Sequence, residues 1–328
     1  MAESIAAQSD PSNADDDLFD ETSYTTSVES SITDYKYEHG RRYHAYQEGR
    51  YLLPNDEIEQ NRLDLQYHAV RLVFGDKLFF APVEMDLKRI LDVGTGTGIW
   101  VEDMADAYPD VEIYGIDLSP IQPRWSAPNV KYQVDDVEQP WTYPSSHFDF
   151  IHTRIMLGSL RDWPNFFTQC IKHLRPGGYV ECQELAVDAR TDDNSFPENS
   201  ALTKWCDIQQ EAMWKIGMEL KITGNMIKDQ MVGAGFVDVV VKEFKTPIGQ
   251  WPKDPKMRET GAFQLVAMLE GIGGLTMALW TRLLGWKKDD VEEELVKVRK
   301  EMQSKSVHSY WPTYAVYGRK PVEQDDES

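Results

Sequence analysis

One short stretch of the chain, residues 89–100 (RILDVGTGTGIW), restricts the possible fold more than any other part of the sequence. It begins with apolar residues that predict a short buried strand: Ile90, Leu91 and Val93. Glycines then occupy every second position, and a helical pattern starts directly after them: Gly94, Gly96 and Gly98. Glycines at such a turn let the backbone turn tightly and let a ligand approach main-chain atoms. The stretch therefore predicts a strand, a ligand-binding turn and a helix.

The spacing of these glycines distinguishes two kinds of ligand. A dinucleotide site uses G-x-G-x-x-G, or the same pattern with a final alanine, because the pyrophosphate rests on the start of the helix. The position that would hold this last small residue is occupied by Ile99. The pattern is therefore G-x-G-x-G, which favours a nucleoside without a pyrophosphate.

Acidic residues follow the next two predicted strands. Residues 112–117 (EIYGID) predict a strand that ends in Asp117, about 20 residues after the glycines, where an acid commonly accepts hydrogen bonds from ribose hydroxyls. A third strand, over residues 130–134, ends at Asp135 and Asp136, and either acid can receive the exocyclic amine of a base. Ligands of open α/β sheets bind at the carboxyl ends of the strands, so we expect the glycines and the acids to meet there.

With these motifs the chain resembles the class I S-adenosylmethionine-dependent methyltransferases. Three more stretches fit strand four, the turn into strand five and the helix before strand six of that class: residues 148–154 (FDFIHTR), 174–180 (LRPGGYV) and 231–236 (MVGAGF). A closer resemblance, over roughly residues 36–320, is to the LaeA-like fungal methyltransferases. It rests on five short motifs: residues 43–51 (YHAYQEGRY), 54–57 (PNDE), 62–64 (RLD), 136–141 (DVEQPW) and 162–164 (DWP).

The resemblance implies an α/β fold with a Rossmann-like seven-stranded sheet, mostly parallel with its last strand antiparallel, and with helical insertions that cap it. The cofactor that it implies is S-adenosyl-L-methionine. The residues that we assign to this cofactor are Asp92, Gly94, Thr95, Gly96, Gly98, Asp117, Leu118, Asp135, Asp136, Arg154 and Tyr46.

The charge of the chain is spread unevenly. The formal net charge is −21, but residues 1–35 hold nine acids without a Lys or Arg, and the segment from Pro321 adds four more acids. The middle of the chain has 42 acids against 34 bases, so we expect no phosphate-tracking surface and no nucleic-acid partner. We expect disordered acidic tails over residues 1–35 and 321–328, which contain few large apolar groups, and one methyltransferase domain over residues 36–320.

Cysteine usage and hydropathy bear on the compartment. Three cysteines are scattered without metal-ligand spacing: Cys170, Cys182 and Cys206. We expect buried thiols and no metal, which fits a cytoplasmic protein and also a nuclear one. The N-terminus lacks the basic and long apolar regions of a signal peptide. The most apolar segment, residues 263–286, contains Glu270 and Arg282, so we expect a buried or pocket-lining helix and no membrane span.

Three segments outside the predicted sheet are expected to enclose the ligands. Residues 36–80 predict an N-terminal helical cap, and residues 186–222 and 250–305 are insertions where this fold builds its substrate chamber. Three tyrosines of the cap could close over the cofactor: Tyr43, Tyr46 and Tyr51. The insertions are rich in large apolar side chains: Trp205, Met213, Trp214, Trp251, Met257, Phe263, Met268, Met277 and Trp280. Core packing accounts for any one of these, but the set favours an apolar or aromatic acceptor.

Periodicity predicts further elements of the sheet and its cover. A helix over residues 98–108 is expected to bury Trp100, Met104 and Ala107 on one face. Later strands are expected at three places: residues 179–185, 237–244 and 311–317.

Methyl transfer is an in-line displacement, so the enzyme mainly holds the acceptor and the methyl donor in line and sometimes removes a proton. Two candidate polar groups, His152 and Arg154, share a face at the end of the predicted fourth strand. His152 is the predicted catalytic residue because its unperturbed pKa of about 6.5 suits proton removal, and the alternative is a hydrogen-bonded core histidine. Arg154 is expected to meet the cofactor's carboxylate, and the alternative is an ion pair with Asp92 or Asp117.

These observations predict an S-adenosylmethionine-dependent methyltransferase that modifies an oxygen, nitrogen or sulfur atom of a small molecule in fungal secondary metabolism. The alternative is a LaeA-like regulatory methyltransferase that works with a protein partner in a nuclear complex. A third hypothesis is a binding module that has lost transfer, but the complete set of glycines and acids argues against it. The acceptor and the oligomeric state are left open.

Overall fold

A seven-stranded sheet forms the centre of the computed structural model, which describes residues 35–44, 52–83 and 87–322. Its strands are β3 (Arg89–Val93), β4 (Glu112–Asp117), β5 (Val130–Val134), β6 (Phe148–Arg154), β7 (Leu174–Leu185), β8 (Val237–Pro247) and β9 (Tyr310–Arg319). Their order in space is β5-β4-β3-β6-β7-β9-β8, and β9 runs antiparallel to both of its neighbours while the pairs from β5 to β7 are parallel. The predicted Rossmann-like α/β fold is confirmed, and its antiparallel strand lies one place inside the edge of the sheet.

Strand β7 begins five residues earlier than the sequence predicts, at Leu174 instead of Tyr179. The early part pairs through its backbone: Leu174 lies opposite Phe148, and the Gly178 carbonyl accepts a hydrogen bond from Lys320 N at 2.8 Å. A register shift separates this part from the regular ladder. Residues 175–178 (RPGG) indicate a turn, because proline and glycine are uncommon inside strands and the side-chain pattern gives no sign of the backbone pairing.

The two faces of the sheet are covered by different helices. Leu91 of β3 belongs to the large core cluster that α4 (Trp163–His173) and α6 (Gly224–Gly233) complete. Ile90 belongs to a second cluster, which α3 (Ile99–Ala107) completes on the other face. Alternate side chains of one strand therefore anchor both layers, as the period of a strand requires.

Helix α3 buries Trp100 and Met104, as predicted, but Ala107 is exposed and Ala105 is buried instead. The prediction for Ala107 was wrong because the helix ends at this residue and the chain turns away at Tyr108. The prediction for the cysteines is confirmed, since all three are free and buried.

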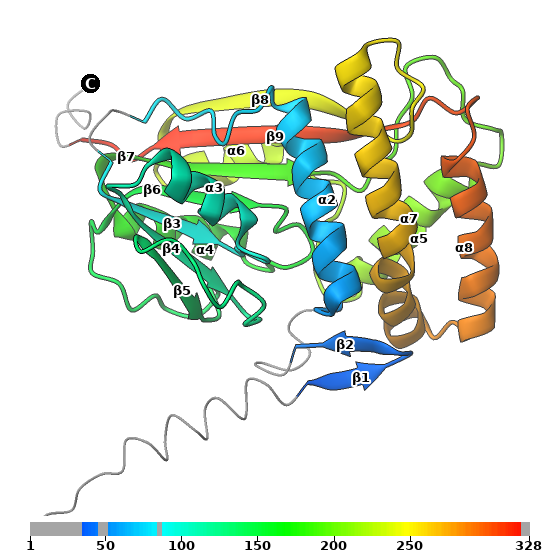
Figure 1. Cartoon of the computed structure of the whole chain (residues 1–328), viewed down its shortest axis with the longest axis horizontal. Helices are drawn as coiled ribbons and strands as arrows, with labels where there is room; N and C mark the ends of the chain where they lie inside the picture. Colours follow the sequence, from blue (N-terminus) through cyan, green and yellow to red (C-terminus); the bar gives the residue numbers. More distant parts are fainter. Residues whose placement is uncertain (1–34, 45–51, 84–86, 323–328) are drawn as a thin grey trace, which may run out of the picture.

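A layer of helices stands at the end of the sheet toward which the arrowhead of β7 points (Figure 1). It consists of α2 (Glu57–Val73), α5 (Ala201–Trp214), α7 (Pro255–Leu284) and α8 (Lys288–Met302). Helix α7 packs against the other three helices of this layer. Within the described residues it is the one helix long and apolar enough to cross a membrane, and 56% of its most apolar window is buried inside the molecule. The apolar side chains of α7 are therefore largely used in packing against the neighbouring helices.

The N-terminal part is not wholly helical, contrary to the prediction for residues 36–80. Strands β1 (Lys36–Glu38) and β2 (Arg41–Tyr43) form an antiparallel hairpin before α2. An ion pair of 2.6 Å between Arg41 Nε and Asp56 Oδ2 joins the hairpin to the start of α2, where Asp56 is also the N-cap. Short strands made mostly of charged residues carry little hydrophobic signal, so the sequence pattern does not reveal them. The predicted tails lie almost wholly outside the described residues.

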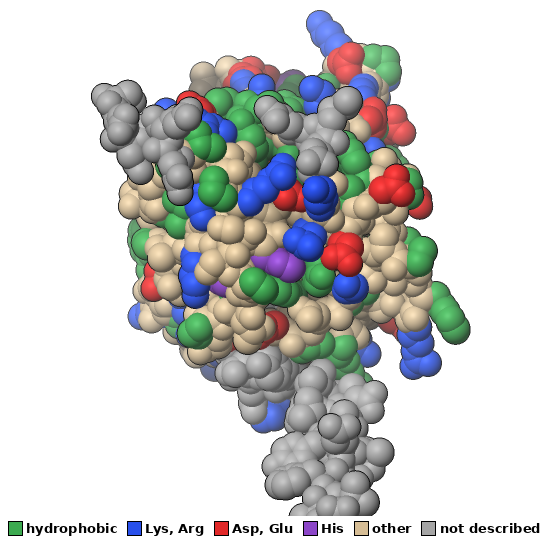
Figure 2. Space-filling model, turned by 90° about the vertical axis from the view of Figure 1, so that its left-hand side faces the viewer, with side chains coloured by type: hydrophobic (Ala, Val, Ile, Leu, Met, Phe, Trp, Pro, Cys, Tyr) green, Lys and Arg blue, Asp and Glu red, His purple; other side chains and the backbone are tan. Residues whose placement is uncertain are grey.

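The face drawn in Figure 2 carries Lys and Arg side chains over its middle, with Asp and Glu side chains scattered among and around them. The net charge of −21 is therefore not displayed uniformly by the folded domain. This agrees with the concentration of acids in the terminal segments, where residues 1–35 alone contain nine.

Candidate active site

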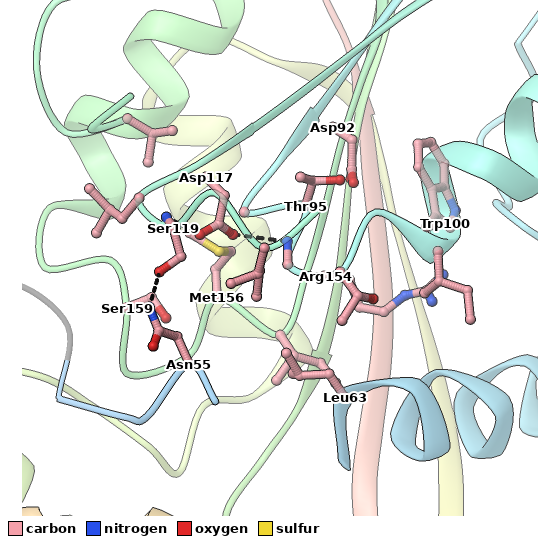
Figure 3. Close-up of a pocket in the computed structure, with 18 of the residues that line it drawn as sticks. Asn55, Leu63, Asp92, Thr95, Trp100, Asp117, Ser119, Arg154, Met156 and Ser159 are labelled. Carbon is pink, nitrogen blue, oxygen red and sulfur yellow. Dashed lines mark hydrogen bonds between the residues drawn. The ribbon is translucent and has the colours of Figure 1, made fainter. Parts of the chain in front are cut away.

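A first cavity, of about 150 Å³, opens where β3, β4 and β6 end (Figure 3). Asp117, the last residue of β4, lies at its wall and accepts two backbone hydrogen bonds of 2.9 Å, from Gly96 N and Ser119 N. Burial raises the pKa of this carboxyl, although the two N–H donors oppose the rise. Asp117 thus ties the glycine turn to the next strand and keeps further lone pairs for a ligand, as the sequence predicted for a ribose.

The three glycines have different reasons to be glycine, although all have positive φ. A Cβ at Gly94 would collide with Met156 Sδ, and a Cβ at Gly98 would collide with Tyr132 Oη. A Cβ at Gly96 would meet only Leu63 Cδ1, at 3.7 Å, and would otherwise project into open space. Gly96 is therefore the position at which the main chain itself is presented to a ligand.

His152 lies in the wall of the first cavity, and its side chain is fully buried. Its Nδ1 is 2.7 Å from Asp92 Oδ1, and its ring stacks on that of Trp100 with centroids 3.8 Å apart. The Nε2 atom has no hydrogen-bond partner among the described residues. The arrangement orients the Asp92 carboxylate at the cavity. The catalytic role of His152 stays a prediction.

Arg154, the last residue of β6, presents a cation to the first cavity. Its Nε donates to Gln183 Oε1 at 2.9 Å, and its guanidinium lies 4.7 Å from the ring centroid of Tyr67. Neither Nη atom has a partner in the part of the chain that the structure describes, and no ion pair with Asp92 or Asp117 is formed there. Burial lowers the pKa of the guanidinium, which nevertheless stays charged at neutral pH. An unpaired buried cation matches a ligand carboxylate.

The residues that the sequence predicted after β4 and β5 also line the first cavity. Leu118 lies there, and so do both acids of the pair: Asp135 Oδ1 accepts from Asp136 N at 2.8 Å, while Asp136 Oδ1 accepts from Glu138 N at 3.0 Å. Apolar side chains of Ile121 and Val137 stand beside them, as the flat faces of a base require. Both acids stay candidates for the base. Thr95 also lines the cavity with an unpaired buried hydroxyl.

The N-terminal segment contributes residues to the first cavity that the sequence did not assign. Asn55 lines this cavity and donates from Nδ2 to Ser119 Oγ at 3.3 Å. Asp64 of α2 does not line the cavity itself but accepts from Thr97 Oγ1, in the glycine turn, at 2.7 Å. The signal was present, because both residues fall in the PNDE and RLD motifs. Tyr46 and Tyr51 lie outside the described residues, and Tyr43 packs under Arg282 instead of lining the cavity.

A second cavity, of about 120 Å³, lies beside the first and is lined mainly by apolar side chains. Both insertions contribute to it, as expected of a chamber, through Trp205 and Met213 of α5 and Met268 of α7. Other large residues of the insertions do not line it: Trp214, Trp251, Met257, Phe263, Met277 and Trp280. Trp214 is exposed and Trp280 is a fully buried core residue.

The two cavities meet at three residues that line both: Leu63, Gln66 and Ile155. Ile155 follows β6 directly and has φ of 52°, which is unusual for a β-branched residue. Its backbone N donates to the Gln183 carbonyl at 2.8 Å and holds the residue in that conformation. Backbone strain of this kind is concentrated at functional sites. The sequence pattern carries no signal for Ile155 or for Gln66.

The fold and the first cavity together define a class I methyltransferase that binds S-adenosylmethionine. Residues 65–236 match the family model described as "Methyltransferase domain". The chain is 41% identical to the methyltransferase pytC of Aspergillus terreus over 92% of its own length and 93% of the relative's. It is 35% identical to the secondary metabolism regulator LAE1 of Cochliobolus heterostrophus, over 87% and 94% of the two chains. A protein-methionine methyltransferase, laeA of Emericella nidulans, is 32% identical over 87% of this chain and 76% of its own.

The chain therefore belongs to the LaeA-like fungal methyltransferases, as the sequence motifs predicted. It is an S-adenosylmethionine-dependent methyltransferase.

Proposed function

We propose that this enzyme methylates a small, largely apolar molecule that is held in the second cavity. The observation that carries the proposal is the contact between the two cavities at Leu63, Gln66 and Ile155. A cofactor in the first cavity and an acceptor in the second would meet where these three side chains line both cavities. Methyl transfer needs this arrangement, because it is an in-line displacement between two bound reactants.

The residues of the first cavity have separate tasks in this proposal. When bound, the cofactor supplies an activated methyl group together with its leaving group. Arg154 binds its carboxylate, Asp117 accepts from the ribose hydroxyls, and Asp135 or Asp136 accepts from the base. His152, which lies with Asp92 in the cavity wall, orients the Asp92 carboxylate. The chain thus contributes mainly positioning and the exclusion of water.

The lining of the second cavity supports a small-molecule acceptor. Its described lining is mostly apolar, includes the indoles of Trp205 and Trp311, and contains no carboxylate; helices α2, α5 and α7 supply much of this wall. Sites of this kind bury most of a ligand's surface against apolar and aromatic walls. A peptide substrate with Lys or Arg would need an open groove with acidic walls instead. The similarity to LAE1, which is described as a secondary metabolism regulator, supports secondary metabolism as the setting.

The alternative acceptor is a protein, and the names of two relatives favour it. LAE1 is described as a secondary metabolism regulator and laeA of Emericella nidulans as a protein-methionine methyltransferase. A methionine side chain is itself apolar, so the lining of the second cavity does not distinguish it from a metabolite. A regulator would also need a protein partner and access to the nucleus.

The purified full chain with methyl-labelled cofactor tests the proposal against this alternative. We expect label in at least one member of a panel of phenols, amines and thiols from fungal extracts, and none in histone peptides or in the chain itself. Val187→Phe, which fills part of the second cavity, should reduce that transfer at least about tenfold, the effect of roughly 1.4 kcal/mol. Val296→Phe, at a position of 62% exposure on α8, is the matched control and should have no effect. Site-specific label in a protein would favour the regulator.

A further inference from the structure

Gln66 of α2 occupies the junction of the two cavities. Its side chain is buried, with 6% exposure, and it is one of the few polar groups in the wall of the second cavity. Leu63 and Ile155, which share the junction with it, have no polar side-chain atoms. Gln66 therefore supplies the side-chain hydrogen-bonding group at the place where the reacting atoms would meet.

The orientation of the Gln66 amide follows from its neighbour. Arg62 Nη1 lies 3.0 Å from Gln66 Oε1. A guanidinium has only N–H donors, so the amide atom that faces it must be the oxygen. The amide Nε2 then points away from Arg62, and it has no hydrogen-bond partner among the described residues. The junction thus receives an N–H donor.

Two features hold Arg62 in the position that fixes this orientation. Its Nε and Nη2 both donate to Glu59 Oε1, at 3.0 and 2.7 Å, and both side chains are buried. Its aliphatic part fits over Gly271 of α7, where a Cβ would collide with Arg62 Cδ. Glu59, Arg62 and Gln66 thus form a connected buried network that ends at the junction.

We propose that Gln66 is a positioning residue that donates a hydrogen bond from Nε2 to an oxygen of the acceptor beside the atom that receives the methyl group. The acceptor class is then a small, largely apolar molecule that bears a carbonyl, ether or carboxylate oxygen. This inference rests on the proposed function, because it takes the second cavity as the acceptor site. The site rejects a molecule without that oxygen, since binding would leave the buried donor unpaired.

Binding of a matched pair of probes tests this role. Acetophenone and ethylbenzene differ at one position, a carbonyl in place of a methylene. Binding is followed by the ¹³C-methyl signals of Met213 and Met268, which line the second cavity, in full-length protein saturated with S-adenosylhomocysteine. We expect acetophenone to bind about threefold to tenfold more tightly, which is the size of one ordinary hydrogen bond. Gln66→Glu keeps an oxygen for Arg62 but replaces the donor by an acceptor, and it should abolish that preference.

Gln209 provides the matched control in the same cavity. Its Nε2 donates to the Leu275 carbonyl at 2.8 Å, and its Oε1 accepts from Trp280 Nε1 at 3.1 Å, so both ends of its amide are already engaged and one of its two N–H donors is used. Gln209→Glu should leave the ratio of the two affinities unchanged, even if both fall. Equal affinities in the wild type, or a preference that survives Gln66→Glu, would overturn the role of Gln66. Failure of both probes to move the two methionine signals would instead overturn the second cavity as the acceptor site.

Discussion

Arg154 and Glu184 are ionisable residues of the sheet whose environments differ. Arg154 has two unpaired Nη atoms in the first cavity, so its charge is available to a ligand. Glu184 of β7 is fully enclosed and accepts backbone hydrogen bonds from Met156 N and Leu157 N, at 3.0 and 3.2 Å. The first residue is placed to bind, whereas the second holds the chain after β6 where the two cavities meet.

Arg154→Met should weaken the binding of S-adenosylhomocysteine by roughly tenfold to a hundredfold, because a hydrogen-bonded charge contributes about 1.5–3 kcal/mol. Titration calorimetry measures the loss. The control ligand is methylthioadenosine, which has the same nucleoside but lacks the carboxylate, and its affinity should not change. An equal loss for both ligands would show that Arg154 acts on the structure of the cavity instead of on the carboxylate.

Burial raises the pKa of Glu184 to about 8, against the opposing effect of its two backbone donors. The unfolded chain releases this proton near 4.5, so the folded state binds more protons between the two values. The contribution of Glu184 to stability is therefore fully present below pH 4.5 and is lost as the pH rises through about 8. Thermal melts should show that the wild type loses stability relative to Glu184→Gln over this range.

At the scale of elements, the contact of α7 with α2 depends on where α7 lacks side chains. A Cβ at Gly271 would collide with Arg62, and a Cβ at Gly274 would collide with Arg41, so both arginines of the N-terminal segment lie in gaps along α7. Gly273 lies between these two glycines in the sequence. A Cβ added there would be 3.6 Å from Arg299 Nη2, so the position has room for a side chain. The glycines of this helix therefore do not serve a common purpose.

Gly271→Ala and Gly273→Ala should have opposite effects on stability. Alanine favours a helix over glycine by up to about 1 kcal/mol, and Gly273→Ala should gain most of it. Gly271→Ala should lose a net of up to about 2 kcal/mol, because overpacking costs roughly 1–3 kcal/mol and outweighs the gain in helix propensity while displacing Arg62. Urea unfolding measures both differences in free energy. Equal stabilisation by the two substitutions would show that Arg62 moves aside without cost.

At the scale of the whole molecule, the N-terminal segment completes both cavities. Pro54 and Asn55 line the first cavity, and Leu52 and Leu53 line the second. Helix α2 follows directly and carries the three residues Glu59, Arg62 and Gln66 of the buried network. The sheet alone would therefore leave both cavities without one wall.

Two truncations separate the acidic tail from this wall. Removal of residues 2–34 should leave thermal stability and the affinity for S-adenosylhomocysteine unchanged, because the segment offers little apolar surface to bury. Removal through residue 60 should lower both, since it takes away Asn55 and Glu59. Melting curves and calorimetry on the two proteins provide the comparison. If the shorter deletion is as damaging as the longer one, the tail has a structural role.

Much of the first cavity could be predicted from the sequence, because its parts are local. Gly96 lies in the turn directly after β3 and Asp117 ends β4, and these parallel strands bring the two residues together at one edge of the sheet. The length of β7 could not be predicted, because its first part pairs through the backbone across a register shift. The hairpin of β1 and β2 was missed for lack of a hydrophobic pattern.

The sequence by itself determined the class of fold, the cofactor and the strand ends that bind it, since short motifs with regular spacing encode these features. Only the tertiary structure decided that Gln66 and Ile155 share a junction, which of the large apolar residues line the second cavity, and that Arg154 keeps free donors. Each of these depends on the packing of α2, α5 and α7 on the sheet. Such contacts join segments far apart in the chain, and no local pattern records which side chains will meet.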